Sequence, residues 1–180
     1  DVECQAIDGL EHIDRVVCVD GRSIGRNRRS CLATYSGVWN DIRKLYARTR
    51  EARARGIGAP RFSFNSGSGR CSQCKGTGVQ DIRMNMLPDA ELPCLFCHGQ
   101  RFNRDVLNIR FAGRSIHDVL NLRVDEALEA FSGIESTVRR LRPFQQVGLG
   151  YMTLGQSAST FSGGEAQRIK LAKELCKKST

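Results

Sequence analysis

The chain has 180 residues, of which 40% are hydrophobic, and a formal net charge of +9. That length supports one good core or two small ones. No apolar run is long enough to cross a bilayer and no signal-peptide core follows Asp1, which excludes membrane-spanning and secreted classes and predicts a soluble, cytoplasmic protein.

The positive charge is concentrated in one segment. Between Arg22 and Arg61 there are eleven Lys or Arg and only two acids, Asp41 and Glu51, while bases and acids elsewhere cancel. A concentrated basic segment favours a polyanionic partner, and nucleic acid is the leading candidate. The alternative is an ordinary solvated basic face of a helix.

The first third of the chain is expected to place one helix between two short strands. A β-branched run over residues 15–19 predicts a buried strand, and residues 21–35 predict a loop. A helix is expected to open at residue 36 or 37 and to stop at residues 56–60, because its apolar residues recur at helical spacing. These residues are Val38, Ile42, Leu45 and Tyr46. Phe62 and Phe64 alternate with polar residues, which predicts a second strand.

Four cysteines form the most specific motif. They stand in two Cys-x-x-Cys pairs with nineteen residues between the pairs: Cys71, Cys74, Cys94 and Cys97. This is the spacing of a tetrahedral zinc held by four thiolates, and an ion with sulfur at every position is structural, not catalytic. The alternatives are ordinary buried thiols or disulfides. The matched pairs and the lack of a thioredoxin-like βαβ pattern argue against them.

The residues around the cysteines agree with a metal module. Gly76, Gly78 and Gly99 follow the pairs and can supply the positive φ angles that such tight turns need. Alternation over residues 82–86, a turn near Pro88 and a return through Leu92 predict a hairpin. The other cysteines are expected to be free thiols in a reducing cytoplasm. They are Cys4, Cys18, Cys31 and Cys176.

Short helices are predicted after the second cysteine pair. Residues 107–111 alternate as a strand and Gly113 turns the chain. Ser115 is expected to cap a short helix, and apolar periodicity predicts a second helix over residues 124–131. A third helix begins near Ile134 and is expected to be closed by Pro143.

The last informative stretch is a helix start. Ser162 and Glu165 form a capping box, with Gly163 and Gly164 at the first two helical positions. The two glycines lower helix stability but leave the backbone N–H groups uncovered at the positive end of the dipole, which favours a phosphate site. The simpler interpretation is a well-capped helix.

This stretch also carries a resemblance. Ser162-Gly-Gly-Glu-Ala-Gln-Arg168 resembles the signature motif of ATP-binding-cassette (ABC) ATPases. With Val147-Gly-Leu-Gly-Tyr151 and Leu154-Gly-Gln156 before it, the chain resembles the UvrA family, the damage-recognition ATPases of the bacterial excinuclease. Further matches to the second half of that family are Gly25-Arg26, Arg29-Ser30, Ala33-Thr-Tyr35, Arg61-Phe-Ser-Phe-Asn65, Leu87-Pro-Asp89 and the four cysteines. The resemblance covers residues 13–176.

The resemblance implies an α+β fold, namely part of an ABC ATPase cassette (the signature-domain region) with an inserted four-cysteine zinc hairpin module. Residues 1–35 would end the nucleotide-binding core strand and form a Q-loop-like segment, residues 36–69 a basic helix and linker, residues 70–105 the zinc module, and residues 106–180 a helical signature subdomain. The phosphate-binding loop would precede Asp1 and the magnesium-binding strand would follow Thr180. This chain alone is therefore expected not to hydrolyse ATP.

The function implied by the resemblance is ATP-dependent recognition of DNA damage in nucleotide excision repair. The signature residues would contact ATP and magnesium held by the opposite cassette: Ser162, Gly163, Gly164, Glu165, Gln167 and Arg168. Basic residues would contact double-stranded DNA: Arg26, Arg29, Arg43, Lys44, Arg50, Arg101 and Arg104. The implied partners are the remaining cassette halves of the same protein, a second copy in a homodimer and the UvrB component of the excinuclease, without a membrane.

Departures from the family keep alternatives open. The chain has Asp20-Gly-Arg-Ser-Ile-Gly25 where the family usually has Asp-Gln-Ser-Pro-Ile-Gly, so Gly21 lacks a side chain expected near magnesium and the attacking water. This favours a UvrA-like paralogue with a non-repair role, such as drug resistance, or an ATPase-dead regulator. A DnaJ-type zinc chaperone module is a remoter alternative, because Cys71 to Gly78 fits its Cys-x-x-Cys-x-Gly-x-Gly form. The second pair departs from that form, because it lacks the final glycine.

Overall fold

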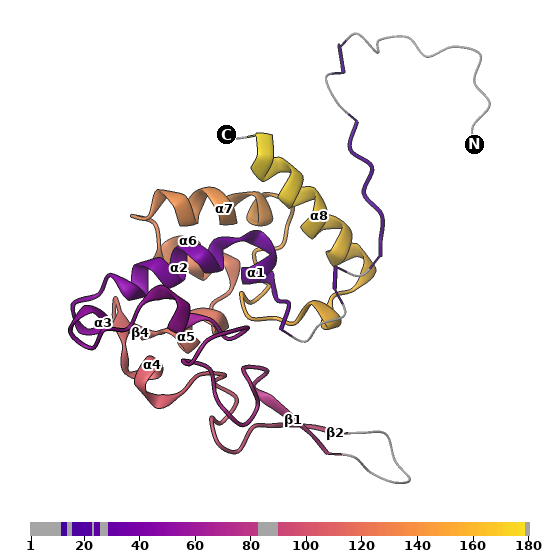
Figure 1. The fold of residues 1–180 in the computed structure, drawn as a ribbon. Coiled ribbons are helices and arrows are strands. Elements are labelled where there is room, and N and C mark those ends of the chain that lie inside the picture. The colour runs from indigo at the N-terminus through magenta and orange to yellow at the C-terminus, as the bar shows by residue number, and fades with distance from the viewer. Residues whose placement is uncertain (1–11, 14–15, 23, 26–28, 83–89, 179–180) are drawn as a thin grey trace.

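The computed structural model describes residues 12–13, 16–22, 24–25, 29–82 and 90–178, and in it a body of short helices carries one projecting hairpin (Figure 1). The α-helices are α1 (Leu32–Ser36), α2 (Val38–Ala47), α3 (Arg50–Ala54), α4 (Arg104–Asn108), α5 (Ile116–Asn121), α6 (Val124–Ala130), α7 (Glu135–Gln146) and α8 (Gly163–Lys178). Two 3-10 helices, η2 (Ala59–Phe62) and η3 (Ala158–Thr160), complete the helical part.

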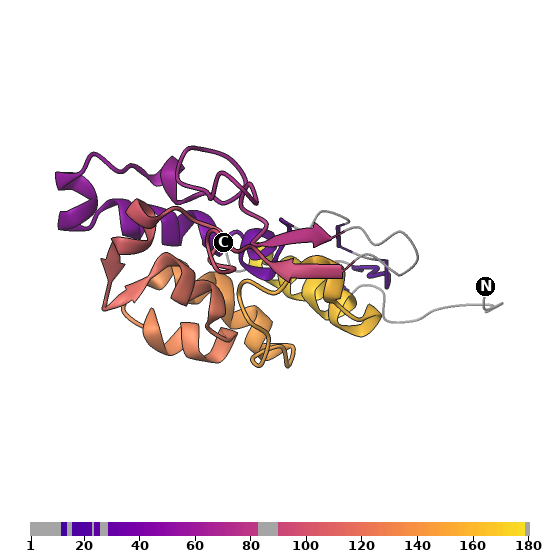
Figure 2. The ribbon, with the colours of Figure 1, turned by 90° about the horizontal axis from the view of Figure 1, so that it is seen from below.

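The strands form two separate antiparallel hairpins. β1 (Val79–Ile82) pairs with β2 (Ala90–Pro93) in the register Val79 to Pro93. β3 (Arg110–Phe111) pairs with β4 (Arg114–Ser115) across a turn at Gly113, whose φ is +78°. Seen from below, the β1 and β2 arrows lie side by side and point in opposite directions (Figure 2).

Helix α2 lies against α1, η2 and α7 and buries one apolar face. The predicted helical residues Val38, Ile42 and Tyr46 are completely buried, which confirms the periodicity. The predicted loop over residues 21–35 was wrong at its end, because α1 begins at Leu32. Gly37, with a φ of +80°, ends α1 and begins α2. The predicted helix also breaks at Thr49, whose hydroxyl accepts a hydrogen bond from the Ala52 N–H and so starts α3.

Aromatic side chains pack the two segments that flank the cysteine pairs against α2. Trp39 has its ring centroid 5.2 Å from that of Phe64 and 6.3 Å from that of Phe102, and the last two rings meet edge to face. The strand predicted for residues 62–65 was wrong. The chain forms η2 instead and places both Phe62 and Phe64 in the core, because packing outweighs a local alternation that has no partner strand.

Helices α5 to α8 form the other side of the core. Ser115 caps α5 as predicted, because its hydroxyl accepts from the Asp118 N–H. Pro143 was expected to close a helix but lies inside α7. The neighbouring Leu141 and Phe144 are completely buried, and their packing offsets the hydrogen bond that a proline removes. On α8 the buried stripe is formed by Ala166, Ile169 and Ala172.

Of two further predicted strands, one is absent from the described residues and the other is only partly formed. Residues 16–19 have no strand beside them, and Val16 is 79% exposed, so the expected buried strand does not form. The alternation over residues 107–111 covers the end of α4, which Asn103 caps, and both residues of β3, so only the end of the predicted strand forms. The predicted hairpin arm through Met84 and Met86, with its turn at Pro88, falls outside the described residues.

In the part of the chain that the structure describes, no helix has the length and apolar character needed to cross a membrane.

Candidate metal centre and signature helix

The two cysteine pairs sit in matched turns. After Cys74 the backbone passes through left-handed Lys75 and Gly76, with φ of +51° and +86°, and after Cys97 it passes through His98 and Gly99, with φ of +49° and +79°. An added Cβ at Gly76 would clash with the carbonyl oxygen of Phe64, so only glycine fits there. The glycine roles predicted from the sequence are confirmed.

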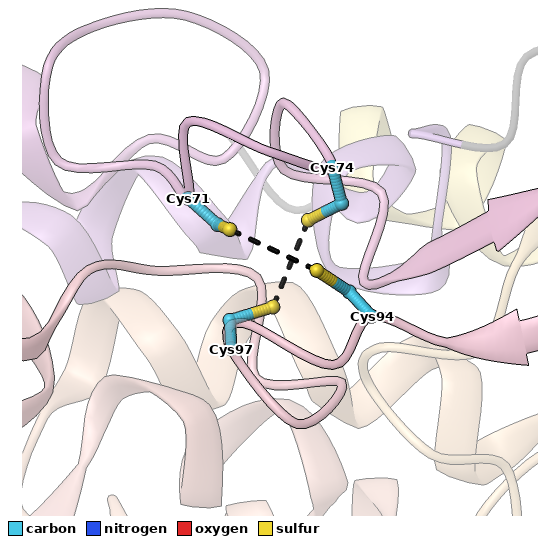
Figure 3. Close-up of side chains that lie close together, drawn as sticks. All are labelled: Cys71, Cys74, Cys94 and Cys97. Atoms are coloured by element: carbon cyan, nitrogen blue, oxygen red, sulfur yellow. Dashed lines mark hydrogen bonds between the residues drawn. The ribbon is translucent and has the colours of Figure 1, made fainter.

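The four sulfur atoms converge on one point (Figure 3). The Sγ atoms of Cys71 and Cys94 are 4.0 Å apart, those of Cys74 and Cys97 are 3.7 Å apart, and all four lie within 4.8 Å of one another. Metal–sulfur bonds of about 2.3 Å place tetrahedral sulfurs about 3.8 Å apart. All four cysteines are buried free thiols, so the cluster is compatible with a structural metal site and the disulfide alternative fails.

Backbone N–H groups donate hydrogen bonds to some of these sulfurs and so favour the thiolate form that binds a cation. The Gly78 N–H donates to the Cys74 sulfur over 3.3 Å. Burial raises the pKa of the Cys71 and Cys97 thiols. Burial acts in the same direction at Cys94, but there the N–H groups of Cys97 and Phe96 outweigh it and lower the pKa to about 7. One thiolate is therefore available near neutral pH, and a bound cation would favour ionisation of the others.

The module is closed at its base by backbone pairing. Arg70 and Phe102 form an isolated antiparallel bridge, and the Cys71 N–H donates to the carbonyl of Arg101 over 2.9 Å. Just above, the Cys94 N–H donates to the carbonyl of Gly78 over 2.9 Å, and β1–β2 continues from there. The predicted hairpin that returns the second pair to the first is confirmed.

The second candidate site is the start of α8. Oε2 of Glu165 accepts from the Ser162 N–H at 2.8 Å, and the Ser162 hydroxyl accepts from the Glu165 N–H at 3.3 Å, so the predicted capping box is formed. Gly163 and Gly164 are exposed, and Gly164 has open space where a side chain would stand. Backbone N–H groups thus face outward at the positive end of a sixteen-residue helix.

Two residues that contact this helix start or the segment beside it, Tyr151 and Lys170, were not among the site residues predicted from the sequence. Tyr151 donates a 2.7 Å hydrogen bond from its hydroxyl to Oε1 of Glu165. Arg168, which the motif did suggest, donates to the carbonyls of Gly148 and Gly164 at 3.4 and 3.5 Å. Lys170 reaches back to residues 20–22, donating to the carbonyls of Asp20 and Arg22 and forming an ion pair with the Asp20 carboxylate.

Segment 20–22 consequently lies beside the signature-like residues. A Cβ at Gly21 would lie 3.5 Å from Nε2 of Gln167, and a Cβ at Gly163 would lie 4.0 Å from the Gly21 carbonyl oxygen. The structure thereby brings Gly21, Gln167 and Gly163 together. Sequence spacing gives no hint of this contact, because about 140 residues separate the two segments.

The basic residues expected at DNA are spread over several elements. Arg43 and Lys44 lie on α2 and Arg50 on α3, while Arg104 begins α4. Arg43 donates to Asn40 over 2.6 Å, and Lys44, Arg50 and Arg104 are exposed. Arg26 falls outside the described residues. Arg29 lines a cavity of about 600 Å³ beside the first cysteine pair. The guanidinium of Arg101 points inward and donates to the carbonyl of Gly155.

The chain is similar to known proteins over nearly its whole length, although no family model matches it. It is 53% identical over 174 residues to UvrABC system protein A of Oceanobacillus iheyensis and 52% identical over 174 residues to that of Bacillus subtilis, and each match covers 97% of this chain and 18% of the relative. The crystal structure of UvrA2 from Deinococcus radiodurans matches with a TM-score of 0.86 and 48% identity, covering 93% of this chain and 21% of that one.

This fold and its cysteine cluster define an α+β portion of a UvrA-like protein, with an inserted four-cysteine module that is compatible with a structural metal site. The chain belongs to the UvrA family. It spans less than a fifth of the length of the UvrABC relatives just named, and the solved structure that it matches is also much longer.

Proposed function

We propose that this chain serves in a protein that recognises DNA damage for nucleotide excision repair and is driven by ATP. The observation that carries the proposal is the 52–53% identity with UvrABC system protein A over 97% of the chain. The cytoplasm is the expected location, because DNA is there and thiolate metal sites persist in reducing surroundings. The proposal includes the division of the chain into a core and Q-loop-like segment (1–35), a basic helix and linker (36–69), a zinc module (70–105) and a helical signature subdomain (106–180).

The metal in the module is proposed to be zinc. Four buried thiols 3.7–4.0 Å apart across the cluster suit a soft tetrahedral cation with no open position. Cys71 and Cys74 would hold it from one turn, and Cys94 and Cys97 from the other. The ion supplies a fixed cross-link at the base of the β1–β2 hairpin, so its role is structural.

The start of α8 is proposed to contact ATP held by the opposite cassette. Magnesium is the other proposed cofactor of the full-length protein, which is proposed to form a homodimer. Gly163 and Gly164 would offer backbone N–H groups to the terminal phosphate, and Ser162 its hydroxyl proton, because the Ser162 N–H is already bonded to Glu165. The helix dipole favours negative charge there. Glu165 would support that contact through the capping box and Arg168 through the neighbouring loop. Gln167 would support it from its place beside Gly21. The remaining cassette halves and the UvrB component of the excinuclease are the other proposed partners.

Double-stranded DNA is proposed to meet the basic residues of α2 and α3, with further contacts from the module. The support is electrostatic, because the excess positive charge of the chain lies between residues 22 and 61. The proposed contacts are Arg26, Arg29, Arg43, Lys44, Arg50, Arg101 and Arg104. Of the described residues in this set, Arg101 is the one that the structure directs inward.

Binding of duplex DNA by the full-length protein tests the proposal. Replacing Arg43 and Arg50 together by Ala should weaken binding to all sequences alike and reduce the slope of log affinity against log salt by about two. The control removes the same charge from α7, with Arg139 and Arg142 replaced by Ala. Equal losses in both variants, or salt-independent binding, would refute the assignment of DNA to α2 and α3.

ATP turnover by the same protein tests the helix start. Ser162→Ala should lower ATP turnover, whereas Ser159→Ala on η3 should leave it unchanged. A wild-type protein that binds damaged DNA without any turnover would establish the ATPase-dead regulator that Gly21 favours. The relatives named above are UvrA proteins, so they lend no support to the chaperone alternative.

A further inference from the structure

Arg101 touches both the metal module and the body of helices. Its φ is +68°, and its carbonyl accepts the Cys71 N–H over 2.9 Å, four residues after Cys97. Its backbone therefore lies between a ligand of the first turn and a ligand of the second. Any metal that fixes those two cysteines also fixes the position of Arg101.

The side chain of Arg101 runs away from the cysteines. Its guanidinium carbon lies 5.3 Å from the centroid of the Phe64 ring, and Nη2 donates to the Gly155 carbonyl over 3.2 Å. A Cβ at Gly78 would lie 3.0 Å from the Arg101 Cγ, so the glycine leaves room for this path. Nη1 is buried and has no hydrogen-bond partner within the described residues. A guanidinium with a buried, unpaired N–H depends on the contacts that it does make.

Gly155 lies in the loop that leads to the signature-like helix α8, and backbone contacts hold it in place. Its N–H donates to the Leu120 carbonyl over 2.7 Å, and a Cβ at Gly155 would lie 2.9 Å from that same oxygen. The adjacent Leu154 accepts from the Ala33 N–H over 2.8 Å. From this point η3 leads directly to Ser162. A shift of Gly155 would therefore move the start of α8.

We propose that Arg101 is a positioning residue that couples occupancy of the four-thiolate site to the placement of loop 153–158, and so to the signature-like start of α8. The consequence for nucleotide rests on the function proposed above, but the coupling itself does not. With metal bound, the two turns hold Arg101 where its guanidinium reaches Gly155. Without metal, the turns lose their cross-link and this contact loosens. Coupling between two equilibria is reciprocal. If bound metal favours the Arg101–Gly155 contact by a given factor, then loss of this contact must weaken the metal affinity by the same factor.

Metal affinity in the full-length protein gives the first test, measured by competition for zinc with a chromogenic chelator. Arg101→Met keeps an unbranched chain over Phe64 but removes the donor, whereas Arg101→Lys keeps a donor. We expect about a tenfold weaker affinity for Arg101→Met, equivalent to about 1.4 kcal/mol, and near wild-type affinity for Arg101→Lys. Arg142→Met removes the same charge from an exposed position on α7 and should leave the zinc affinity unchanged.

Hydrogen exchange of the wild-type protein gives a second test that needs no variant. Removing the metal with a chelator should speed exchange of amides 153–158 about tenfold, while amides 124–130 of α6 keep their rate. In Arg101→Met the 153–158 amides should already exchange fast with metal bound.

Three results would overturn the coupling. They are an Arg101→Met affinity within about twofold of wild type, an equal loss in Arg142→Met, or exchange at 153–158 that does not respond to metal. Neither measurement uses ATP or DNA, so failure of the proposed function and failure of this coupling are separable.

Discussion

The Tyr151 hydroxyl donates a 2.7 Å hydrogen bond to one oxygen of Glu165, whose other oxygen accepts the Ser162 N–H at 2.8 Å. The carboxylate therefore joins the glycine-rich loop before η3 to the start of α8. The Ser162 N–H, followed by the Tyr151 hydroxyl, lowers the pKa of Glu165 below its ordinary value of 4.5. This relationship predicts a pH-dependent contribution to stability.

The sign follows from the direction of that shift. A carboxyl whose pKa is lower in the folded state stabilises the fold above its unfolded pKa and loses this contribution as pH falls through the folded value. We expect Glu165→Gln to lower the free energy of unfolding at neutral pH by up to about 1 kcal/mol, because the site is largely solvated, and to show a smaller loss between about pH 5 and pH 2 than wild type.

Urea unfolding across this pH range measures the effect of Glu165. Glu129→Gln, an exposed residue on α6, removes the same charge and serves as the control. Parallel pH profiles for wild type and Glu165→Gln would show that the bond to Ser162 contributes nothing to stability.

The sequence predicted those parts of the site that are local. Capping by Ser115 and Ser162, the positive φ angles of Gly76, Gly78 and Gly99, and convergence of the four thiols all depend on residues a few positions apart or on metal-ligand spacing. Such patterns hold because the chemistry that requires them acts over one turn. The resemblance to UvrA then supplied the family, which the similarity to known proteins confirms.

Elements decided by long-range packing were predicted less well. Phe62 and Phe64 alternate like a strand, yet both lie in the core next to a 3-10 helix. Tyr46 packs against Phe62, whereas Trp39 and Phe102 pack against Phe64. Pro143 remains inside α7 because its neighbours are buried. The contacts of Tyr151 and Lys170 across the site join segments whose proximity no periodicity reveals.

Gly76 should be the most sensitive glycine of the module. It combines a φ of +86° with a position where any Cβ would clash with the Phe64 carbonyl. We expect Gly76→Ala to lower the free energy of unfolding by more than about 2 kcal/mol and to reduce bound metal, because the turn that aims Cys74 must shift.

Two other glycines provide a graded control, with unfolding midpoints and metal content as the measurements. Gly56 has a φ of +63° but open space, so Gly56→Ala should cost about 1 kcal/mol. Gly133 has a negative φ and open space, and Gly133→Ala should be neutral or slightly stabilising. If Gly76→Ala destabilised no more than Gly56→Ala, close approach to Phe64 would not constrain the turn.

Metal should protect the four thiols of the module. In the native protein a thiol reagent should modify exposed Cys18 quickly and should modify the four module thiols only after chelation, because bound thiolates are unavailable and buried. Metal affinity should fall as pH is lowered, since protons compete for the same sulfurs and burial already raises the pKa of Cys71 and Cys97. Cys31→Ser should leave metal content unchanged, whereas Cys97→Ser should reduce it. Full reactivity of all module thiols before chelation would exclude a bound metal.

Lys170 should hold segment 20–22 against α8. Its ammonium donates to the carbonyls of Asp20 and Arg22, at 3.1 and 2.8 Å, and pairs with the Asp20 carboxylate, and these contacts keep Gly21 beside Gln167. We expect Lys170→Met to release the segment while the buried stripe of α8 stays in place, because the methionine keeps the aliphatic stem but lacks all three donors. Trypsin should then cleave after Arg22 several times faster, as measured by mass spectrometry of the first products. Lys173→Met, which removes a charge from the same helix at a residue lying over the Tyr35 ring, should leave that rate unchanged. Equal cleavage in wild type and Lys170→Met would mean that other contacts hold Gly21 at the signature-like helix, and the ion pair with Asp20 would then be incidental to that arrangement.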